Sequence, residues 1–124
     1  MEPRPLFWVA GSLRDLAAFP ERVRSIMGFA LFRAQCGAKH VDAKPLRGFG
    51  GAAVLEVCAD HDGGTFRAVY TVRFREAVYV LHAVQKKAKA GIATPRQEVE
   101  LIERRLVLAG DMHARWLRLR GEGR

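Results

Sequence analysis

Three segments rich in β-branched and aromatic residues follow one another between residues 53 and 86, separated only by short turns. They are Ala53–Ala59, Thr65–Arg73 and Ala77–Lys86. The first connection, Asp60 to Gly64, consists mostly of Asp and Gly residues, which tolerate left-handed backbone angles. Consecutive strands joined this closely pair antiparallel, because a parallel pair needs a crossover of about a dozen residues or more. The pattern therefore predicts an antiparallel meander.

The part of the chain before the meander predicts one strand and two helices. Pro5–Val9 is a short aromatic and aliphatic run typical of a strand. Ser12 has the side chain of a helix N-cap, and Pro20 is expected to close this brief helix and to open the next. From Glu21 to Ala34 the apolar residues recur at the spacing of an amphipathic helix, which Gly37 ends.

A further helix signature follows the meander. Thr94 is suited to the N-cap, Pro95 to the first helical position and Gln97 to the third. We expect Gly110 to end or kink this helix, with residues 111–124 as a basic segment behind a core of about 5–108. Its apolar stripe is Val99, Ile102, Leu106 and Ala109, and its solvated face carries Glu98, Glu100 and Glu103. The 124 residues thus predict one small α+β domain.

Charge narrows the class of partner. The chain has 21 Lys and Arg against 13 Asp and Glu, a formal net charge of +8. Residues 1–62 carry 8 basic and 7 acidic side chains, whereas residues 63–124 carry 13 and 6. A field concentrated on one half attracts polyanions, and RNA, DNA or an acidic protein would all satisfy it. No apolar run approaches the roughly 20 residues that span a bilayer, so we expect no membrane partner and a cytoplasmic location.

The candidate site lies where the strands end. Arg67 and Arg73 are separated by an even number of residues on one predicted strand, so both are expected on one face. Lys86, Lys87 and Lys89 cluster at the end of the next strand. Cations on a rigid sheet can bind phosphate and stabilise the charge that develops when it reacts. His82, within the same apolar strand, is interpreted as a core histidine.

No metal or cofactor site is predicted. Asp60, His61 and Asp62 have ligand-type side chains, but this composition is more typical of a turn than of a metal site. The glycines at 48, 50 and 51 lack the Lys-Ser/Thr ending of a phosphate loop and precede a strand. We therefore expect the chain to need no cofactor.

An ordered set of segments carries a family resemblance. It comprises Lys44–Gly51, Val54–Glu56, Thr65–Arg73, Val78–Lys87 and Gly91–Pro95. This set resembles the phage-derived, RelE-like branch of the RelE/HigB/ParE toxin superfamily, which supplies the toxins of type II toxin–antitoxin modules. The fold that this resemblance implies has an N-terminal strand and two helices, a twisted antiparallel sheet and a C-terminal helix.

The resemblance also implies an activity. Ribosome-dependent members cut mRNA in the ribosomal A site, use the RNA's own 2′-hydroxyl as nucleophile, need no metal, and are neutralised by an antitoxin that is commonly a helix-turn-helix protein. By position, Arg67 would contact the scissile phosphate, and Lys86 and Lys87 would support phosphate binding and proton transfer. Arg47, Arg73 and Lys89 are expected to bind RNA.

Two other functions stay open. Several RelE-like enzymes place a tyrosine or histidine close to the C-terminus, whereas this tail offers His113 and Trp116 in no matching register. ParE-like members of the superfamily instead inhibit DNA gyrase, although they usually lack the basic set. A basic binding module without catalytic activity would also account for the net charge.

Overall fold

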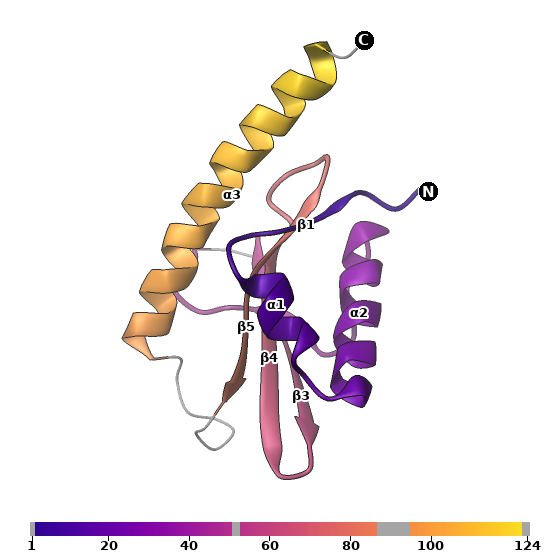
Figure 1. Ribbon diagram of the computed structural model, residues 1–124, viewed down its shortest axis with the longest axis vertical. Coiled ribbons are helices and arrows are strands. Elements are labelled where there is room, and N and C mark those ends of the chain that lie inside the picture. Colours follow the sequence, from indigo (N-terminus) through magenta and orange to yellow (C-terminus); the bar gives the residue numbers. More distant parts are fainter. Residues whose placement is uncertain (1, 51–52, 87–94, 123–124) are drawn as a thin grey trace.

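The computed structural model describes residues 2–50, 53–86 and 95–122 (Figure 1). Five strands form one sheet in the order β1-β5-β4-β3-β2. Helices α1 and α2 lie on one face of this sheet and α3 lies on the other (Figure 1). The predicted α+β class is confirmed. The elements are β1 Leu6–Trp8, α1 Ser12–Ala17, α2 Glu21–Gln35, β2 Ala43–Pro45, β3 Val54–His61, β4 Gly64–Thr71, β5 Val78–Lys86 and α3 Arg96–Glu122.

The meander is present as the sequence predicts. β3 pairs antiparallel with β4, and β4 pairs antiparallel with β5. The turn between β3 and β4 has only two residues, Asp62 and Gly63, with φ angles of 49° and 79°. Two successive positive φ angles are the geometry of a type I′ hairpin, whose twist matches that of the flanking strands.

The two outer strands differ from the prediction. β1 pairs parallel with β5, Leu6 opposite Val78 and Trp8 opposite Val80, so the sheet is mixed rather than wholly antiparallel. The helices and the meander between β1 and β5 supply the long connection that a parallel pair requires. β2, a strand that the sequence analysis does not include, pairs antiparallel with β3 at the opposite edge.

A β-bulge in β5 changes which side chains face α3. Val69 lies opposite His82 but Tyr70 lies opposite Val80, so Leu81 has no partner on β4. Val80 and His82 are two residues apart and would share a face of a regular strand, but the extra residue reverses the alternation. Val80 packs in the core under α2, and His82 faces α3.

Each face of the sheet has its own core. The one under α2 contains the apolar stripe of that helix, including Val23, Met27 and Ala30. The one under α3 is built around Val69, Tyr79, Leu81, Ile102 and Ala109. The second layer fixes α3 over the sheet, with its first turns above the ends of β4 and β5 that lie next to the hairpin.

The helix ends also correct the sequence interpretation. Gly11 rather than Ser12 is the N-cap of α1, and the buried Ser12 hydroxyl donates to the carbonyl of Val80 at 3.1 Å. Pro20 is likewise the N-cap of α2 rather than its first residue. α3 continues through Gly110 to Glu122, so the predicted break does not occur. Among the described residues no helix has the length and apolar character needed to cross a membrane.

Candidate nucleic-acid site

Close to the β3–β4 hairpin, the α3 face of the sheet carries three rows of cross-strand neighbours. Alternate residues of each strand point to this face, and the register aligns them. The arrangement brings Arg67 and Lys86 to one face as diagonal neighbours on adjacent strands, a distance that long side chains can span. From β3 through β4 to β5 the rows are Glu56, Val69 and His82, then Cys58, Arg67 and Val84, then Asp60, Thr65 and Lys86.

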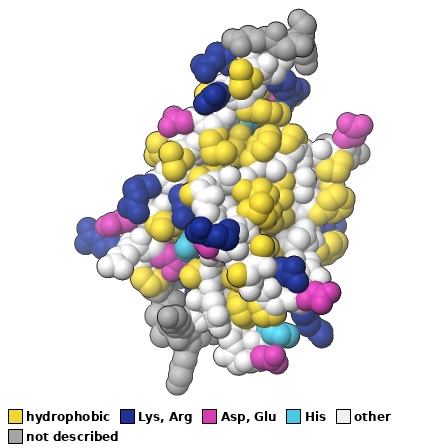
Figure 2. Space-filling view, viewed as in Figure 1, with side chains coloured by type: hydrophobic (Ala, Val, Ile, Leu, Met, Phe, Trp, Pro, Cys, Tyr) yellow, Lys and Arg dark blue, Asp and Glu magenta, His cyan; other side chains and the backbone are white. Residues whose placement is uncertain are grey.

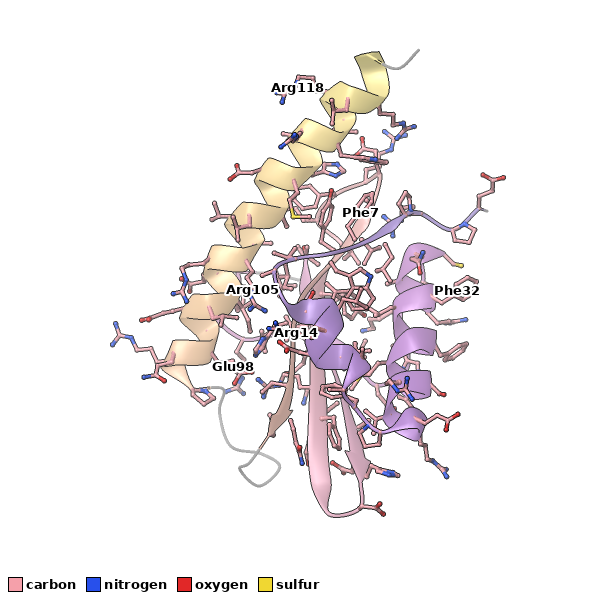
Figure 3. All side chains as sticks on the ribbon, viewed as in Figure 1. Phe7, Arg14, Phe32, Glu98, Arg105 and Arg118 are labelled. Atoms are coloured by element: carbon pink, nitrogen blue, oxygen red, sulfur yellow. The ribbon has the colours of Figure 1, made fainter. Side chains whose placement is uncertain are left out.

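Arg67 lies at the centre of this grid, and its side chain is held by two carboxylates. Only 1% of the residue is exposed. Its Nε lies 2.9 Å from Oε2 of Glu56 on the neighbouring strand. Its Nη1 donates to Oε1 of Glu98, also at 2.9 Å, and Glu98 comes from the first turns of α3 (Figure 3). The guanidinium is therefore buried and neutralised by the chain's own acids.

Two more groups complete the cluster around Arg67. Lys44 Nζ lies 3.7 Å from Oε1 of Glu56, and His82 Nε2 lies 3.3 Å from Oε1 of Glu98. Hydrogen bonding to His82, then the nearby charge of Arg67, lowers the pKa of Glu98 despite the opposing effect of burial. The negative charges of Glu56 and Glu98 balance the positive charges of Arg67 and Lys44. The cluster can accept an anion at Arg67 only if a carboxylate gives way.

The structure separates the other predicted site residues. Lys86 is half-buried at the end of β5, on the same face as Arg67. Arg73 is not on a strand, since β4 ends at Thr71, whose hydroxyl accepts a hydrogen bond from the Arg73 amide. Arg73 and Arg47 are both exposed in connecting segments, so the prediction that Arg73 shares the face of Arg67 is wrong. Lys87 and Lys89 lie outside the described residues.

Sequence reasoning missed the acidic half of the cluster. Glu98 was expected on the solvated face of α3, but it points to the sheet and pairs with Arg67. It lies four residues before the buried Ile102, and this spacing places the two on one helix face. Glu56 occurs among apolar residues of β3, two residues from Val54 on the same side. Those two spacings are the signals that would have identified the pair.

His113 lies at the other end of α3 and has a packing role. Its Nδ1 and the Tyr79 hydroxyl are 3.0 Å apart, and its Nε2 lies 2.9 Å from Oε1 of Glu76. The ring stacks on Phe74, with 4.5 Å between centroids. A helix rises about 1.5 Å per residue, so His113 is roughly 22 Å along α3 from Glu98 and does not reach Arg67. Its hydrogen bond lowers the pKa of Glu76.

The described residues include no group of three or more His, Cys, Asp or Glu side chains placed to hold a metal ion. A pocket of about 610 Å³ opens beside α1, on the α2 side of the sheet, and is lined by residues such as Phe19, Phe66 and Gln85. Its described lining has two aspartates and neither lysine nor arginine, so it is poorly suited to phosphate. Arg67 and its neighbours are thus the better candidate for an anion site.

Comparison with known proteins identifies the fold. A mutant of the Escherichia coli toxin RelE in the free state superposes with a TM-score of 0.54 at 17% identity, covering 85% of this chain and 96% of that one. A chain of the toxin–antitoxin complex RelBE2 from Mycobacterium tuberculosis gives 0.45 at 21% identity, covering 68% and 100%. No curated protein matches the sequence. The similarity to RelE shows a shared fold.

The sequence also matches a family model. The family is described as phage derived protein Gp49-like, and the match runs over residues 14–107. This span holds most of α1, all of α2, all of the meander and the first turns of α3. It therefore includes every member of the Arg67 cluster. Because the match covers well over half of the chain, the protein belongs to the Gp49-like phage-derived family.

Proposed function

We propose that the protein is the toxin of a type II toxin–antitoxin module and that it cuts mRNA on the ribosome, in the cytoplasm. The observation that carries the proposal is the placement of Arg67 and Lys86 on one sheet face, in a chain of a RelE-like toxin family. The basic second half of the chain supports an RNA partner, because it supplies the long-range attraction that phosphates require.

The chemistry that fits this site needs no metal. The 2′-hydroxyl of the RNA attacks the adjacent phosphorus, the bond to the 5′-oxygen breaks, and a 2′,3′-cyclic phosphate remains. Negative charge builds on the non-bridging oxygens, where a planar guanidinium and an ammonium group stabilise it. Arg67 and Lys86 take these roles in the proposal, with Lys87 assisting proton transfer. Arg47, Arg73 and Lys89 bind flanking phosphates.

Arg67 has to exchange partners in this reaction. In the free protein, its Nη1 donates to Glu98, so this carboxylate uses the hydrogen bond that a phosphate oxygen would need. RNA binding at Arg67 therefore requires the first turns of α3 to move away from the sheet. His82 contacts the same Glu98 oxygen, with 3.3 Å between its Nε2 and Oε1 of Glu98.

The proposed partner is a cognate antitoxin, of the helix-turn-helix class that the family resemblance implies. The chain would be inactive in that complex and active on mRNA in the ribosomal A site once the antitoxin is removed.

The test is mapping of 3′ ends on a defined mRNA bound to programmed ribosomes. Wild type is expected to cut within the A-site codon, and Lys86→Ala is expected to cut at least tenfold more slowly. Lys39→Ala, which removes an exposed lysine after α2, is the matched control and should cut like wild type. Arg67→Ala should not cut, with its folded fraction measured in parallel because the residue is buried.

Other outcomes would assign another function. If competent ribosomes yield no cuts while the purified protein inhibits supercoiling by gyrase, the chain acts as ParE-like toxins do. If neither activity is seen and RNA binding weakens steeply with salt, the chain is a basic binding module. Cutting by Lys86→Ala at the wild-type rate would leave the nuclease but remove Lys86 from its site.

A further inference from the structure

The C-terminal half of α3 carries apolar side chains that no described element covers. Leu108 is 47% exposed, Met112 37% and Leu119 52%. Figure 2 shows hydrophobic side chains gathered over this part of α3 and the neighbouring N-terminal strand. The helix extends past the end of the sheet, so its last turns have no layer beneath them (Figure 1). Monomeric proteins rarely leave large contiguous apolar surfaces open without a binding role.

These side chains follow the pattern of a coiled-coil helix. Along α3, positions 101, 105, 108, 112, 115 and 119 are spaced by alternating steps of four and three residues. That alternation is the a/d repeat, which keeps one narrow face toward a partner helix. We call the face the α3 seam, and it consists of Leu101, Arg105, Leu108, Met112, Arg115 and Leu119. It is about 27 Å long, enough for five turns of a second helix.

Only part of the seam is used inside the protein. Leu101 packs partly into the core under α3, and Arg105 donates to the carbonyl of Leu81, which the bulge leaves without a ladder partner. Beyond these two, the seam residues are exposed and Arg115 interrupts the apolar row. A charged residue within such a seam selects a partner with the opposite charge and sets the register of pairing.

The charge around the seam indicates the chemistry of the partner. Between residues 104 and 120, α3 has five arginines and one acidic residue, Asp111. Arg104 and Arg118 lie beside the seam on its solvent side and are exposed. Basic residues flanking an apolar helix seam favour an acidic amphipathic helix and disfavour a basic one. RNA would use the arginines but would leave the apolar row without a partner.

We infer that the α3 seam is a docking surface for an acidic amphipathic helix of a partner protein. The seam residues after 107 lie beyond the segment that matches the family model. None of the exposed seam residues is part of the Arg67 cluster. The inference therefore does not depend on whether the chain cuts RNA.

Binding to a synthetic helix tests the inference directly. The probe is a fluorescein-labelled 21-residue peptide with leucine at its a and d positions and glutamate at the flanking positions. A second peptide replaces each glutamate with lysine. In fluorescence anisotropy, the full-length protein is expected to bind the acidic peptide at least tenfold more tightly than the basic one.

Two double variants of equal charge locate the contact. Leu108→Glu with Leu119→Glu places two acids in the seam and should weaken binding of the acidic peptide at least tenfold. Val107→Glu with Leu117→Glu is the matched control, because both residues are exposed on α3 but lie outside the seam. The control should bind within about twofold of wild type. Circular dichroism of both variants verifies that they are folded.

Three results would overturn the inference. The acidic peptide could fail to bind wild type, or it could bind the two double variants equally. Sedimentation velocity could show a dimer of wild type that the seam variant alone disperses, which would make a second copy the occupant. Finally, a 12-nucleotide single-stranded RNA could lose binding in the seam variant alone while the peptide never binds, which would make the seam an RNA surface.

Discussion

Arg67 is buried against two carboxylates, and its charge is compensated only by their presence. Removing an ion from water costs several kcal/mol, and an opposite charge close by offsets this cost. Removing one partner leaves the others uncompensated, so we expect Arg67→Ala to lower the free energy of unfolding by about 3–5 kcal/mol. Urea unfolding followed by circular dichroism measures this loss.

An exposed ion pair of the same helix provides the control. Arg96 pairs with Glu100 at 3.1 Å, and both side chains are largely in water. Arg96→Ala should change the free energy of unfolding by no more than about 0.5 kcal/mol, because such pairs contribute little. Equal losses in the two variants would show that Arg67 is not held as a buried pair.

The titration of Glu98 gives a second prediction at this scale. The hydrogen bond from His82, then the nearby charge of Arg67, lowers the pKa of Glu98 in the folded protein. A carboxylate with a depressed folded pKa contributes stability that is complete above its unfolded pKa and is lost as the pH falls through the folded one. Between about pH 5 and pH 3, wild type should therefore lose more stability than Glu98→Gln.

Urea unfolding at several pH values measures this difference. Glu100→Gln is the matched control, since Glu100 lies two residues away and is exposed. It should keep the wild-type pH dependence. The pKa of Glu76 is also lowered, so its protonation also reduces stability at low pH. This loss is common to all three proteins and cancels in the comparison. Parallel profiles for wild type and Glu98→Gln would contradict the placement of Glu98 on Arg67.

The meander predicted from the sequence puts Arg67 and Lys86 on neighbouring strands, but it does not show what surrounds them. The partners of Arg67 come from β3 and from a helix 31 residues away in sequence. Nothing local in the sequence distinguishes Glu98 from the solvated Glu100, apart from its spacing to Ile102. The bulge at Leu81, which turns His82 toward α3, has no local signal either.

At the scale of elements, α3 shows packing overriding a helix breaker. Glycine costs about 1 kcal/mol relative to alanine in a helix interior, which is why Gly110 predicted a break. Ala109 and His113 are both buried against the sheet, and this packing keeps α3 helical across Gly110. A Cβ at Gly110 would meet no atom within 4 Å outside its own helix backbone and chain neighbours.

Gly110→Ala should therefore raise the free energy of unfolding by about 0.5–1 kcal/mol. The contrasting variant is Gly63→Ala, where φ is 79° in the hairpin turn. A side chain is strained at that angle, so stability should fall by about 1 kcal/mol. Thermal and urea unfolding of both variants measure the two signs. Destabilisation by Gly110→Ala would mean that α3 is kinked at this residue.

The far half of α3 is fixed by a polar contact. His113 joins Tyr79 and Glu76 and stacks on Phe74. His113→Ala leaves the buried Tyr79 hydroxyl without that partner, so we expect a loss of about 1–3 kcal/mol. Amide hydrogen exchange of residues 110–120 should quicken. Arg115→Ala, on the exposed side, is the control and should leave both quantities near wild type.

For the whole molecule, local patterns predicted the three-strand meander and the helices that cover the sheet. They did not predict where the N-terminal strand joins the sheet, because pairing across about 70 residues depends on packing and not on local sequence. The parallel pairing of β1 with β5 is one such case. It places the ring of Phe7 in contact with the rings of Tyr79 and Trp116. α3 is thereby attached at two separate places, through Glu98 near its start and through His113 and Trp116 near its end.

These two attachments lead to a prediction about RNA binding. If RNA phosphate takes Arg67 from Glu98, only the start of α3 has to leave the sheet. Hydrogen exchange with a 2′-O-methyl RNA, which binds without a nucleophile for cleavage, should quicken for amides 100–106 and stay unchanged for amides 109–116. Local opening of this kind exposes the backbone of the released turns alone.

Glu98→Gln supplies the matched comparison for this experiment. The variant lacks the charge that competes with phosphate, so it should bind the RNA several-fold more tightly than wild type, whereas Glu100→Gln should bind as wild type does. Tight RNA binding with slower exchange at 100–106 would mean that Arg67 keeps its carboxylate. The phosphates would then be held by exposed cations outside the cluster, and Arg67 would serve to attach α3 to the sheet.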